Sequence, residues 1–322
     1  MKAVVFRKYG SPDVLQLVEV EKPAPQANEV LVKVVATAVN PADNHLLSGM
    51  LRFSTGLLKP KNQILGSDIA GRVEAVGPNV TQFKEGDAVF GDLSGHDRGG
   101  FAEYVVAPES ALALKPANVT FEQAAAIPMT AVTALQGLRD KGQLQPGQRV
   151  LINGASGGVG TFAVQIAKAF GGEVTAVVST GKVGLVCAIG ADHVIDYTQE
   201  DFSQAGQQYD LIFDTVGNRA VAEYARALKP MGHFVTTAFL PGLLFRGLRP
   251  ANRARPKMVN MMARPNQDDL AFLADLLATR QVVPVIDRCF PLAEAATALR
   301  YLAEGHARGK VVIMMPNSSE RE

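Results

Sequence analysis

The most constraining feature of the sequence is a glycine-rich turn at residues 154–160, which directly follows the apolar run Val150-Leu151-Ile152. After the turn, apolar residues recur at helical spacing from Phe162 to Phe170. The order predicts strand, turn and helix. In that context glycines let the backbone approach a pyrophosphate, and the helix N-terminus supplies free N–H groups. We therefore predict a site for a nucleotide diphosphate, with these binding residues: Ala155, Ser156, Gly157, Gly158, Val159 and Gly160.

The turn departs from the standard G-x-G-x-x-G pattern at one position. When Gly157 and Gly160 are aligned with the second and third glycines, Ala155 takes the place of the first. The segment Glu173–Val178 then predicts a second strand, which completes a βαβ unit. A purely structural turn is the alternative, and the βαβ context favours nucleotide binding over it.

Length and charge limit the classes of protein that fit. A chain of 322 residues is long for a single core, so two domains are expected. The net charge of only +1 provides no global field for nucleic acid or for an anionic membrane surface. Two isolated cysteines, Cys187 and Cys289, exclude a disulfide framework and a Cys-rich zinc site, and they fit a reducing compartment.

No targeting or membrane-spanning segment is predicted. Residues 1–8 contain only a short apolar run between basic residues, and no segment is long and apolar enough to cross a bilayer. We expect a soluble, cytoplasmic protein with no nucleic-acid partner and no stable membrane insertion.

The first third of the chain alternates short β-like runs with turn residues, which predicts a mainly β, barrel-like domain over residues 1–119. The predicted strands are Ala3–Phe6, Leu15–Val20, Glu29–Ala36, Gly71–Val76 and Phe101–Val106.

From residue 120 the pattern changes to alternating helices and apolar strands. Thr120 and Gln123 form a candidate capping box, and Pro128 interrupts the helix that follows. These units predict a doubly wound parallel sheet over residues 120–284. Residues 285–322 are expected to return to the first domain. Further predicted elements are strands at 193–195, 209–213, 233–237, 285–290 and 310–315, and helices at 220–228, 268–279 and 292–303.

The order of these features resembles the medium-chain dehydrogenase/reductase superfamily, specifically its zinc-free quinone oxidoreductase-like branch. The resemblance covers essentially the whole chain and implies a GroES-like mainly β barrel domain plus a Rossmann domain. The C-terminal segment from Val285 to Val312 is most similar to bacterial NAD(P)-dependent alcohol dehydrogenases and their reticulon-interacting mitochondrial relatives. The matching segments are 38–43, 66–73, 99–104, 154–160, 190–197 and 309–312.

Zinc ligands are missing from the positions where the resemblance would place them. Zinc alcohol dehydrogenases of the superfamily have a cysteine where Asn40 stands and Gly-His-Glu where Gly66-Ser67-Asp68 stands. Catalytic zinc needs about three N, S or carboxylate ligands plus an open position. Asp43 and Asp68 without Cys or His make a poor set, so we expect a metal-free site.

The residues after the second strand of the βαβ unit favour NADP(H). An NAD-preferring site usually has Asp or Glu there, whereas this chain has Ser179, Thr180 and Lys182. Hydroxyls and an ammonium suit a 2′-phosphate, which a carboxylate would repel. The resemblance implies phosphate-binding roles for Ser179, Lys182 and Tyr197. The loop is one residue shorter than in those relatives, so use of both NADH and NADPH stays open.

The resemblance also implies the catalytic candidates Asn40 and Asp43. Asn40 would lie at the nicotinamide and substrate cleft, where its amide could donate to a substrate oxygen or a ribose, and Asp43 would support that loop. A turn at Asn40 and a helix cap at Asp43 are the structural alternatives. Many relatives have a tyrosine near the position of Leu51, so a tyrosine proton donor is not available there. His45 or solvent could supply the proton.

A segment from Phe239 to Arg264 is rich in basic and apolar residues and contains no Asp or Glu. It could form a lid that attracts an anionic ligand or contacts an apolar one, or a packed insertion with a solvated basic face. The residues concerned are Phe239, Leu240, Leu243, Leu244, Phe245, Arg246, Arg249, Arg253, Arg255, Lys257 and Arg264.

We expect a zinc-independent, NADPH-dependent oxidoreductase that transfers hydride to a quinone or an α,β-unsaturated carbonyl. Without a metal to polarise a carbonyl, the acceptor must already be electron-poor, and hydrogen bonds must stabilise the developing oxyanion. The partner is a small-molecule electron acceptor, and the resemblance implies a homodimer. Two alternatives remain: a zinc-free NAD(P)-dependent alcohol or aldehyde dehydrogenase, and a NADPH-binding redox sensor or scaffold without turnover.

Overall fold

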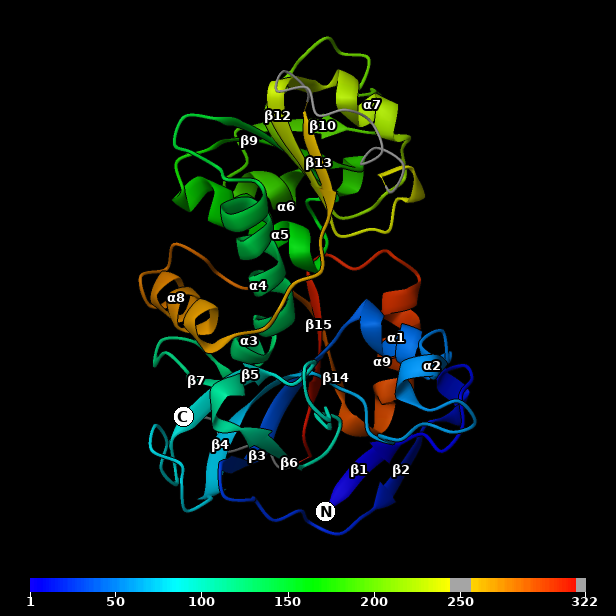
Figure 1. Ribbon diagram of the computed structural model, residues 1–322, viewed down its shortest axis with the longest axis vertical. Coiled ribbons are helices and arrows are strands. Elements are labelled where there is room, and N and C mark those ends of the chain that lie inside the picture. The colour runs from blue at the N-terminus through cyan, green and yellow to red at the C-terminus, as the bar shows by residue number, and fades with distance from the viewer. Residues whose placement is uncertain (244–255, 317–322) are drawn as a thin grey trace. The chain divides into compact units, whose positions relative to one another are not determined.

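The chain divides into two compact units, each built around its own sheet (Figure 1). This computed structural model describes residues 1–243 and 256–316. The N-terminal unit contains Met1–Met129, Pro265–Thr279 and Pro284–Glu322, and the C-terminal unit contains Thr130–Arg264 and Arg280–Val283. The expected limits at residues 119 and 284 stay predictions, because the compact units divide at slightly different points.

The sheet of the N-terminal unit is centred on β3 (Glu29–Val39). Its strand order is β14-β15-β3-β4-β5-β7, and β6 also pairs with β3. All of these pairs are antiparallel except β14 with β15. Strands β1 and β2 form a separate two-stranded sheet. The bounds are β1 Lys2–Val5, β2 Gln16–Glu19, β4 Asp68–Val76, β5 Ala88–Asp92, β6 Tyr104–Pro108, β7 Leu112–Leu114, β14 Ile286–Pro291 and β15 Lys310–Met314.

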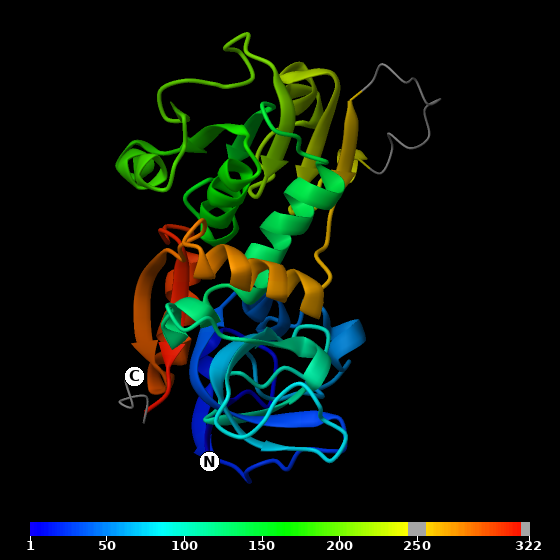
Figure 2. The same cartoon turned by 90° about the vertical axis from the view of Figure 1, so that its left-hand side faces the viewer.

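β3 is long because it packs on the core along most of its length. Val30, Val32 and Val34 are all buried, as alternation along a half-buried strand requires. The last residues of β3 pair with β15, where Val39 lies opposite Val311. A strand from the end of the chain therefore completes the sheet begun by its first third, and β14 and β15 run side by side in Figure 2.

Short helices cover the N-terminal unit. They are α1 (Pro41–Leu47), α2 (Arg52–Thr55), α3 (Phe121–Ala125), α8 (Gln267–Ala278) and α9 (Ala295–Ala303). The predicted capping box before α3 is confirmed: Gln123 N–H donates to Thr120 Oγ1 at 3.2 Å, and Thr120 N–H donates to Gln123 Oε1 at 3.0 Å. Pro128 begins α4 (Pro128–Gln136), inside which the two units divide.

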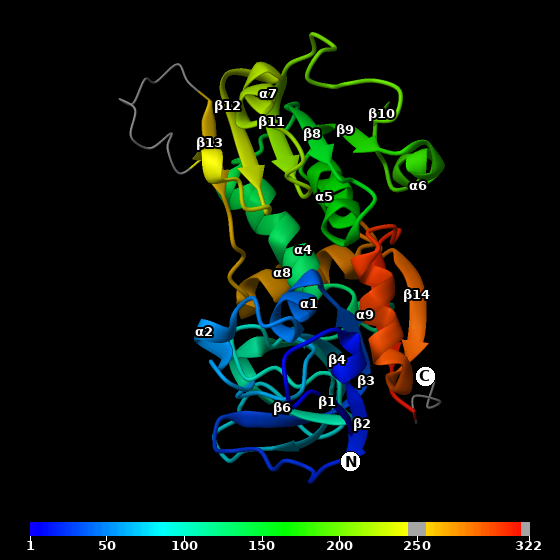
Figure 3. The same cartoon turned by 90° about the vertical axis from the view of Figure 1, so that its right-hand side faces the viewer.

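The C-terminal unit contains a six-stranded, all-parallel sheet in the order β10-β9-β8-β11-β12-β13. Renumbered from β8, this order is the 3-2-1-4-5-6 arrangement of a doubly wound dinucleotide-binding sheet, so the predicted fold class is confirmed. Figure 3 shows α5 beside these strands, and it packs on β8 and β9. The bounds are β8 Arg149–Asn153, α5 Gly158–Ala169, β9 Glu173–Val178, α6 Val183–Ala188, β10 His193–Asp196, β11 Tyr209–Asp214, α7 Val221–Arg226, β12 Leu228–Thr236 and β13 Lys257–Asn260.

The elements that were not predicted include β5, β7, β13 and the short helices α2 and α6. The strand β7 has three residues and α6 has six with a glycine inside, so neither offers enough sequence for a clear period. β13 extends the parallel sheet from inside the basic segment 239–264, and its Lys257 pairs with His233. Residues 244–255 of that segment, with Leu244, Phe245 and four of its arginines, lie outside the described residues.

In the part of the chain that the structure describes, no helix combines the length and the apolar character that a membrane crossing requires.

Candidate functional site

The glycine turn joins β8 to α5, as predicted. Its glycines are needed for different structural reasons. Gly154 has a φ of +82°, which is unfavourable for residues with a Cβ. A Cβ on Gly160 would lie 2.1 Å from the carbonyl oxygen of Gly154, so the helix could not start so close to the strand. Gly157, the N-cap of α5, has an ordinary φ of −82°, and an added Cβ would come no closer than 3.6 Å to other protein atoms. Packing within the protein therefore does not explain Gly157, and the turn has room for a ligand at this point.

A buried carboxylate holds the strand ends around this turn. Asp214, the last residue of β11, accepts hydrogen bonds from Asn153 Nδ2 at 2.8 Å, Thr236 Oγ1 at 2.7 Å and the Tyr224 hydroxyl at 3.1 Å. Burial, and then the nearby Asp214 carboxylate, raise the pKa of Tyr224. The cluster ties the carboxyl ends of β8, β11 and β12 together, which fixes the edge of the sheet where ligands of this fold class bind.

The predicted residues for the 2′-phosphate lie where β9 and β10 end. Ser179 caps the turn that contains Thr180 and Lys182, and Tyr197, 55% exposed, follows β10. The Tyr197 N–H donates to the carbonyl of Val178, so the two strand ends are adjacent.

One acidic residue at this edge was missed in the sequence. Asp196, the last residue of β10, accepts hydrogen bonds from the hydroxyls of Thr180 and Thr198, and these bonds hold the pKa of its carboxyl below the ordinary value. A carboxylate here would repel a 2′-phosphate unless a cation compensates, and Lys182 lies on the adjoining turn.

In the N-terminal unit, a buried network of side chains surrounds Asn40, which lies between β3 and α1. Lys310 Nζ donates to Asn40 Oδ1 at 2.7 Å and to Asp68 Oδ2 at 3.1 Å, and Asn40 Nδ2 donates to the same Asp68 oxygen at 2.9 Å. The other Asp68 oxygen accepts from the Met129 N–H at 2.8 Å. Asn40, Asp68 and Lys310 are 1%, 0% and 2% exposed.

Asp43 supports the same loop from inside α1. Its carboxylate accepts from the Asn40 N–H at 2.8 Å and from the Gly66 N–H at 3.2 Å. Burial raises the pKa of Asp43 to about 6. The two hydrogen bonds act in the opposite direction and lower this pKa, but the effect of burial is larger. The structure thus brings the two catalytic candidates together, with Asp43 bound to backbone groups, while His45 and Leu51 are exposed.

Sequence analysis missed two members of this cluster, Lys310 and Asp92. Lys310 begins a short apolar strand, where a lysine normally marks the solvent-facing end. Asp92 ends β5, which the sequence did not predict. Burial, and then the charge of Asp68, raise the pKa of Asp92 to about 6.

The side chains at the Asn40 and Asp68 positions make a poor ligand set for zinc. Both side chains are hydrogen-bonded to the Lys310 ammonium, a cation that would repel a metal ion from the same oxygens. Among the described residues, no group of three or more His, Cys, Asp and Glu side chains is arranged to hold a metal. The donor set also lacks the nitrogen and sulfur ligands that zinc prefers.

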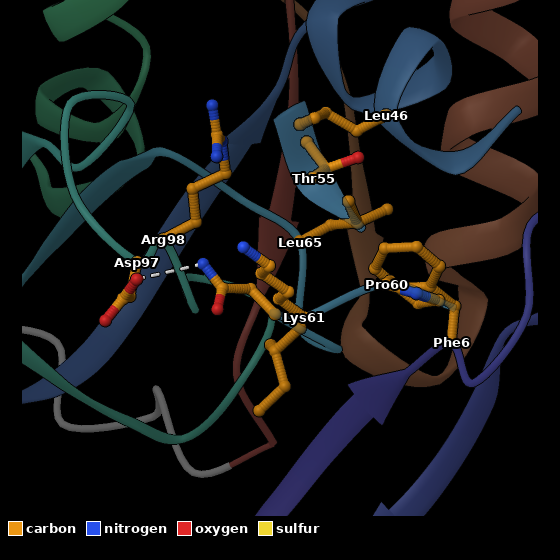
Figure 4. Close-up of a pocket in the computed structure, with 10 residues that line it drawn as sticks. Phe6, Leu46, Thr55, Pro60, Lys61, Leu65, Asp97 and Arg98 are labelled. Carbon is orange, nitrogen blue, oxygen red and sulfur yellow. Dashed lines mark hydrogen bonds between the residues drawn. The ribbon is translucent and has the colours of Figure 1, made fainter. Parts of the chain in front are cut away.

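A cavity of about 230 Å³ lies in the N-terminal unit, beside α1 and α2 (Figure 4). Its apolar wall includes Phe6, Leu46 and Leu65, and its polar residues include Lys61 and Arg98. Leu46 belongs to α1, the helix that Asn40 begins, and Leu65 precedes the Gly66 that Asp43 binds. The lining also includes Asp97, so an apolar ligand with a polar end would fit it.

We predict that Asp92→Asn stabilises the protein above pH 6. The ordinary pKa of 3.8 is raised to about 6 in the folded state, so the folded form keeps a proton that the unfolded form loses. Stability therefore falls between about pH 4 and pH 6, by about 1.4 kcal/mol per pH unit for this group at most. Asparagine removes the charge and can still accept from the Ser94 N–H, which lies 2.7 Å from Asp92 Oδ1.

Urea unfolding at pH 4.5, 6 and 8 measures this difference. The gain of the variant over the wild type should be smallest at pH 4.5 and largest at pH 8. The exposed Asp97→Asn serves as the control and should not change the pH profile. A variant less stable than wild type at pH 8 would show that Asp92 is an ion stabilised by its surroundings.

Comparisons with known proteins agree with this architecture. Residues 26–117 match the family model described as "Alcohol dehydrogenase GroES-like domain", and residues 189–313 match the one described as "Zinc-binding dehydrogenase". The chain is 36% identical to the 2-methylene-furan-3-one reductase of Solanum lycopersicum and 35% identical to the chloroplastic NADPH-dependent alkenal/one oxidoreductase of Arabidopsis thaliana. Each match covers 97% of this chain and 79% of the relative.

A solved structure extends the likeness to three dimensions. The quinone oxidoreductase from Coxiella burnetii superposes with a TM-score of 0.87 at 32% identity, over 98% of this chain and 99% of that one. The resemblance in the sequence is thereby confirmed across both units. The chain belongs to the medium-chain dehydrogenase/reductase superfamily, in the quinone oxidoreductase-like branch of these nicotinamide-dependent oxidoreductases.

Proposed function

We propose that this protein transfers hydride from NADPH to a quinone or an α,β-unsaturated carbonyl, without zinc. The observation that carries the proposal is the buried Lys310 ammonium. It donates hydrogen bonds to the oxygens of Asn40 and Asp68, the two residues at the positions of the zinc ligands in zinc-containing alcohol dehydrogenases. The relatives named above, a 2-methylene-furan-3-one reductase, an alkenal/one oxidoreductase and a quinone oxidoreductase, support the acceptor class.

The chemistry requires little more than orientation and one hydrogen bond. NADPH, when bound, would supply a hydride from C4 of its nicotinamide and be left as NADP⁺, and the hydride would add to the electron-poor carbon of the acceptor as the π electrons move to the acceptor oxygen. The Asn40 amide stabilises this oxyanion by donating an N–H, and Asp43 fixes the Asn40 backbone through a 2.8 Å hydrogen bond. A proton from solvent then completes the reduction, so no buried acid is needed.

We assign the cofactor to the C-terminal unit. The turn Ala155–Gly160 holds the pyrophosphate at the N-terminus of α5, and Ser179, Thr180, Lys182 and Tyr197 surround the 2′-phosphate. Asp196 at the same edge could accept from the ribose hydroxyls of NADH, which supports use of both cofactors with NADPH preferred.

The cavity beside α1 supports a carbon-rich acceptor over a small alcohol. Its wall of Phe6, Leu46 and Leu65 suits the hydrocarbon part of a quinone or enone. We also propose a cytoplasmic location, consistent with the two exposed, unlinked cysteines, and a homodimer, which the family resemblance implies.

An acceptor panel tests the function. Purified protein, treated with a chelator and checked for metal content, is given NADPH with a quinone, an enone, a saturated aldehyde or, in the reverse direction with NADP⁺, an alcohol. We expect turnover with the quinone or the enone and at most slow reaction with the others. Preferential turnover of the aldehyde or alcohol would favour the alcohol dehydrogenase alternative. Tight NADPH binding with no oxidation by any acceptor would favour a sensor.

The glycine turn gives a second prediction, because a side chain would clash with the protein at Gly160 but not at Gly157. Gly160→Ala should destabilise the fold by about 1–3 kcal/mol, since its Cβ would meet the Gly154 carbonyl at 2.1 Å. Gly157→Ala has space in the protein and should leave the melting temperature nearly unchanged, but it should weaken NADPH binding at least tenfold. Thermal melts and fluorescence titration with NADPH measure both effects. Unchanged NADPH affinity in Gly157→Ala would show that the turn does not cradle the pyrophosphate.

Lys182→Ala tests the 2′-phosphate assignment. A charge-assisted hydrogen bond is worth about 1.5–3 kcal/mol, so the Kd for NADPH should rise about tenfold or more while that for NADH changes little. Lys229→Ala is the matched control in the same unit, because the Lys229 ammonium lies 2.8 Å from Asp210 at the opposite end of the strands. Equal weakening of both cofactors by Lys182→Ala would contradict the assignment.

A further inference from the structure

Lys310 is a buried cation whose ammonium protons are all directed at acceptors. Besides Asn40 Oδ1 and Asp68 Oδ2, Nζ lies 3.5 Å from the carbonyl oxygen of Val39. An ammonium that is 2% exposed is costly to bury, so it is kept only where a counter-ion and hydrogen bonds compensate. Asp68, 0% exposed, is that counter-ion.

This arrangement fixes which way the Asn40 amide faces. A lysine ammonium only donates hydrogen bonds, and a carboxylate only accepts them. The amide oxygen must therefore face Lys310, and the amide nitrogen must face Asp68. Rotation of the amide by 180° would place a donor against the ammonium and an acceptor against the carboxylate.

One N–H of the amide is left poorly paired. Asn40 Nδ2 donates one hydrogen to Asp68 at 2.9 Å, while the other reaches only the Ala38 carbonyl, at 3.4 Å. Asn40 is 1% exposed, so bulk water does not satisfy this N–H. A donor in such a dry environment gains more from a ligand oxygen than it would in water.

The ammonium also changes the strength of that donor. A hydrogen bond from a cation to the amide oxygen draws electron density away from the amide nitrogen, which makes its N–H groups better donors. The effect would be largest when the partner is an oxygen that gains negative charge during the reaction.

We propose that Lys310 is a positioning residue for hydride transfer: it holds the Asn40 amide in one orientation and polarises the N–H that stabilises the acceptor's developing oxyanion. The proposal rests on the proposed function, in which Asn40 donates to that oxygen. Lys310 itself touches neither the acceptor nor the cofactor and acts through Asn40.

A purely structural role is the competing explanation. Lys310 begins β15, and its bond to Asp68 joins that strand to the start of β4. If Lys310 served only as a tether, its loss would lower stability but would not depend on the presence of the Asn40 amide. The two explanations therefore differ in how changes at residues 310 and 40 combine.

A double-mutant cycle tests this difference. The variants are Asn40→Ala, Lys310→Met and the double variant, and steady-state rates are measured with NADPH and the best enone or quinone of the panel. Removing an oxyanion donor lowers kcat by about 10²-fold, so we expect a loss of that order in Asn40→Ala and a loss of about tenfold in Lys310→Met. The double variant should be no slower than Asn40→Ala, and KM for NADPH should change little throughout.

Lys310→Met leaves Asp68 buried without its counter-ion, which can prevent folding. A second comparison avoids the unpaired carboxylate: Lys310→Met/Asp68→Asn against Asp68→Asn alone. In Asp68→Asn the Lys310 ammonium loses its counter-ion but keeps the oxygens of Asn40 and Val39 as acceptors, so both proteins are first checked for folding by thermal melts. The same tenfold difference in kcat is expected. Lys115→Met is the matched control, because Lys115 is a half-buried lysine of the same unit that bonds backbone carbonyls and has no contact with Asn40.

The outcomes separate the two proposals. If Asn40→Ala retains the wild-type kcat, the role of Asn40 in the proposed function is wrong. If Asn40→Ala is slow but Lys310→Met/Asp68→Asn turns over as fast as Asp68→Asn, or if the losses at residues 40 and 310 multiply in the cycle, Lys310 does not act through Asn40 and the inference is overturned.

Discussion

The buried ion pair between Lys310 and Asp68 joins segments that lie far apart in the sequence. Asp68 begins β4, Lys310 begins β15, and both contact Asn40, which directly follows the intervening strand β3. Charges in an interior are expensive, so the three side chains have to be held together or not buried at all. The pairings of β3 with β4 and with β15 hold these three side chains together. The conformation of the loop that precedes α1 therefore depends on the two pairings.

Each unit contains a buried carboxylate that accepts hydrogen bonds from several segments of the chain. In the C-terminal unit, Asp214 at the end of β11 accepts hydrogen bonds from the ends of β8 and β12 and from Tyr224 of α7, and so shapes the edge where β8 leads into the glycine turn. In the N-terminal unit, Asp68 gathers donors from Lys310, Asn40 and the Met129 backbone. In both units, the hydrogen bonds to a buried carboxylate fix the conformation of a neighbouring loop, as a preorganised site requires.

Much of the fold was predictable, because its signals are local. The turn at Gly154–Gly160 and the capping box at Thr120 depend on neighbouring residues, and both are found as predicted. The partners of Asn40 were not predictable, since Lys310 is 270 residues away in the chain and nothing near it distinguishes a buried lysine from an exposed one. Asp196 was missed for a related reason: its link to Thr180 depends on the pairing of β9 with β10. Local patterns therefore located the cofactor turn, whereas the electrostatics of both sites arise from pairings between distant segments.

Direct hydride transfer to an activated acceptor without a metal is the proposed reaction, and NADPH deuterated at the transferring position of C4 tests it most directly. The reaction is run with an enone and with protein whose metal content has been measured. We predict a product with one deuterium on the β-carbon and full activity at a metal content far below one ion per chain. Activity that scales with bound zinc, or a product without deuterium at that carbon, would contradict it.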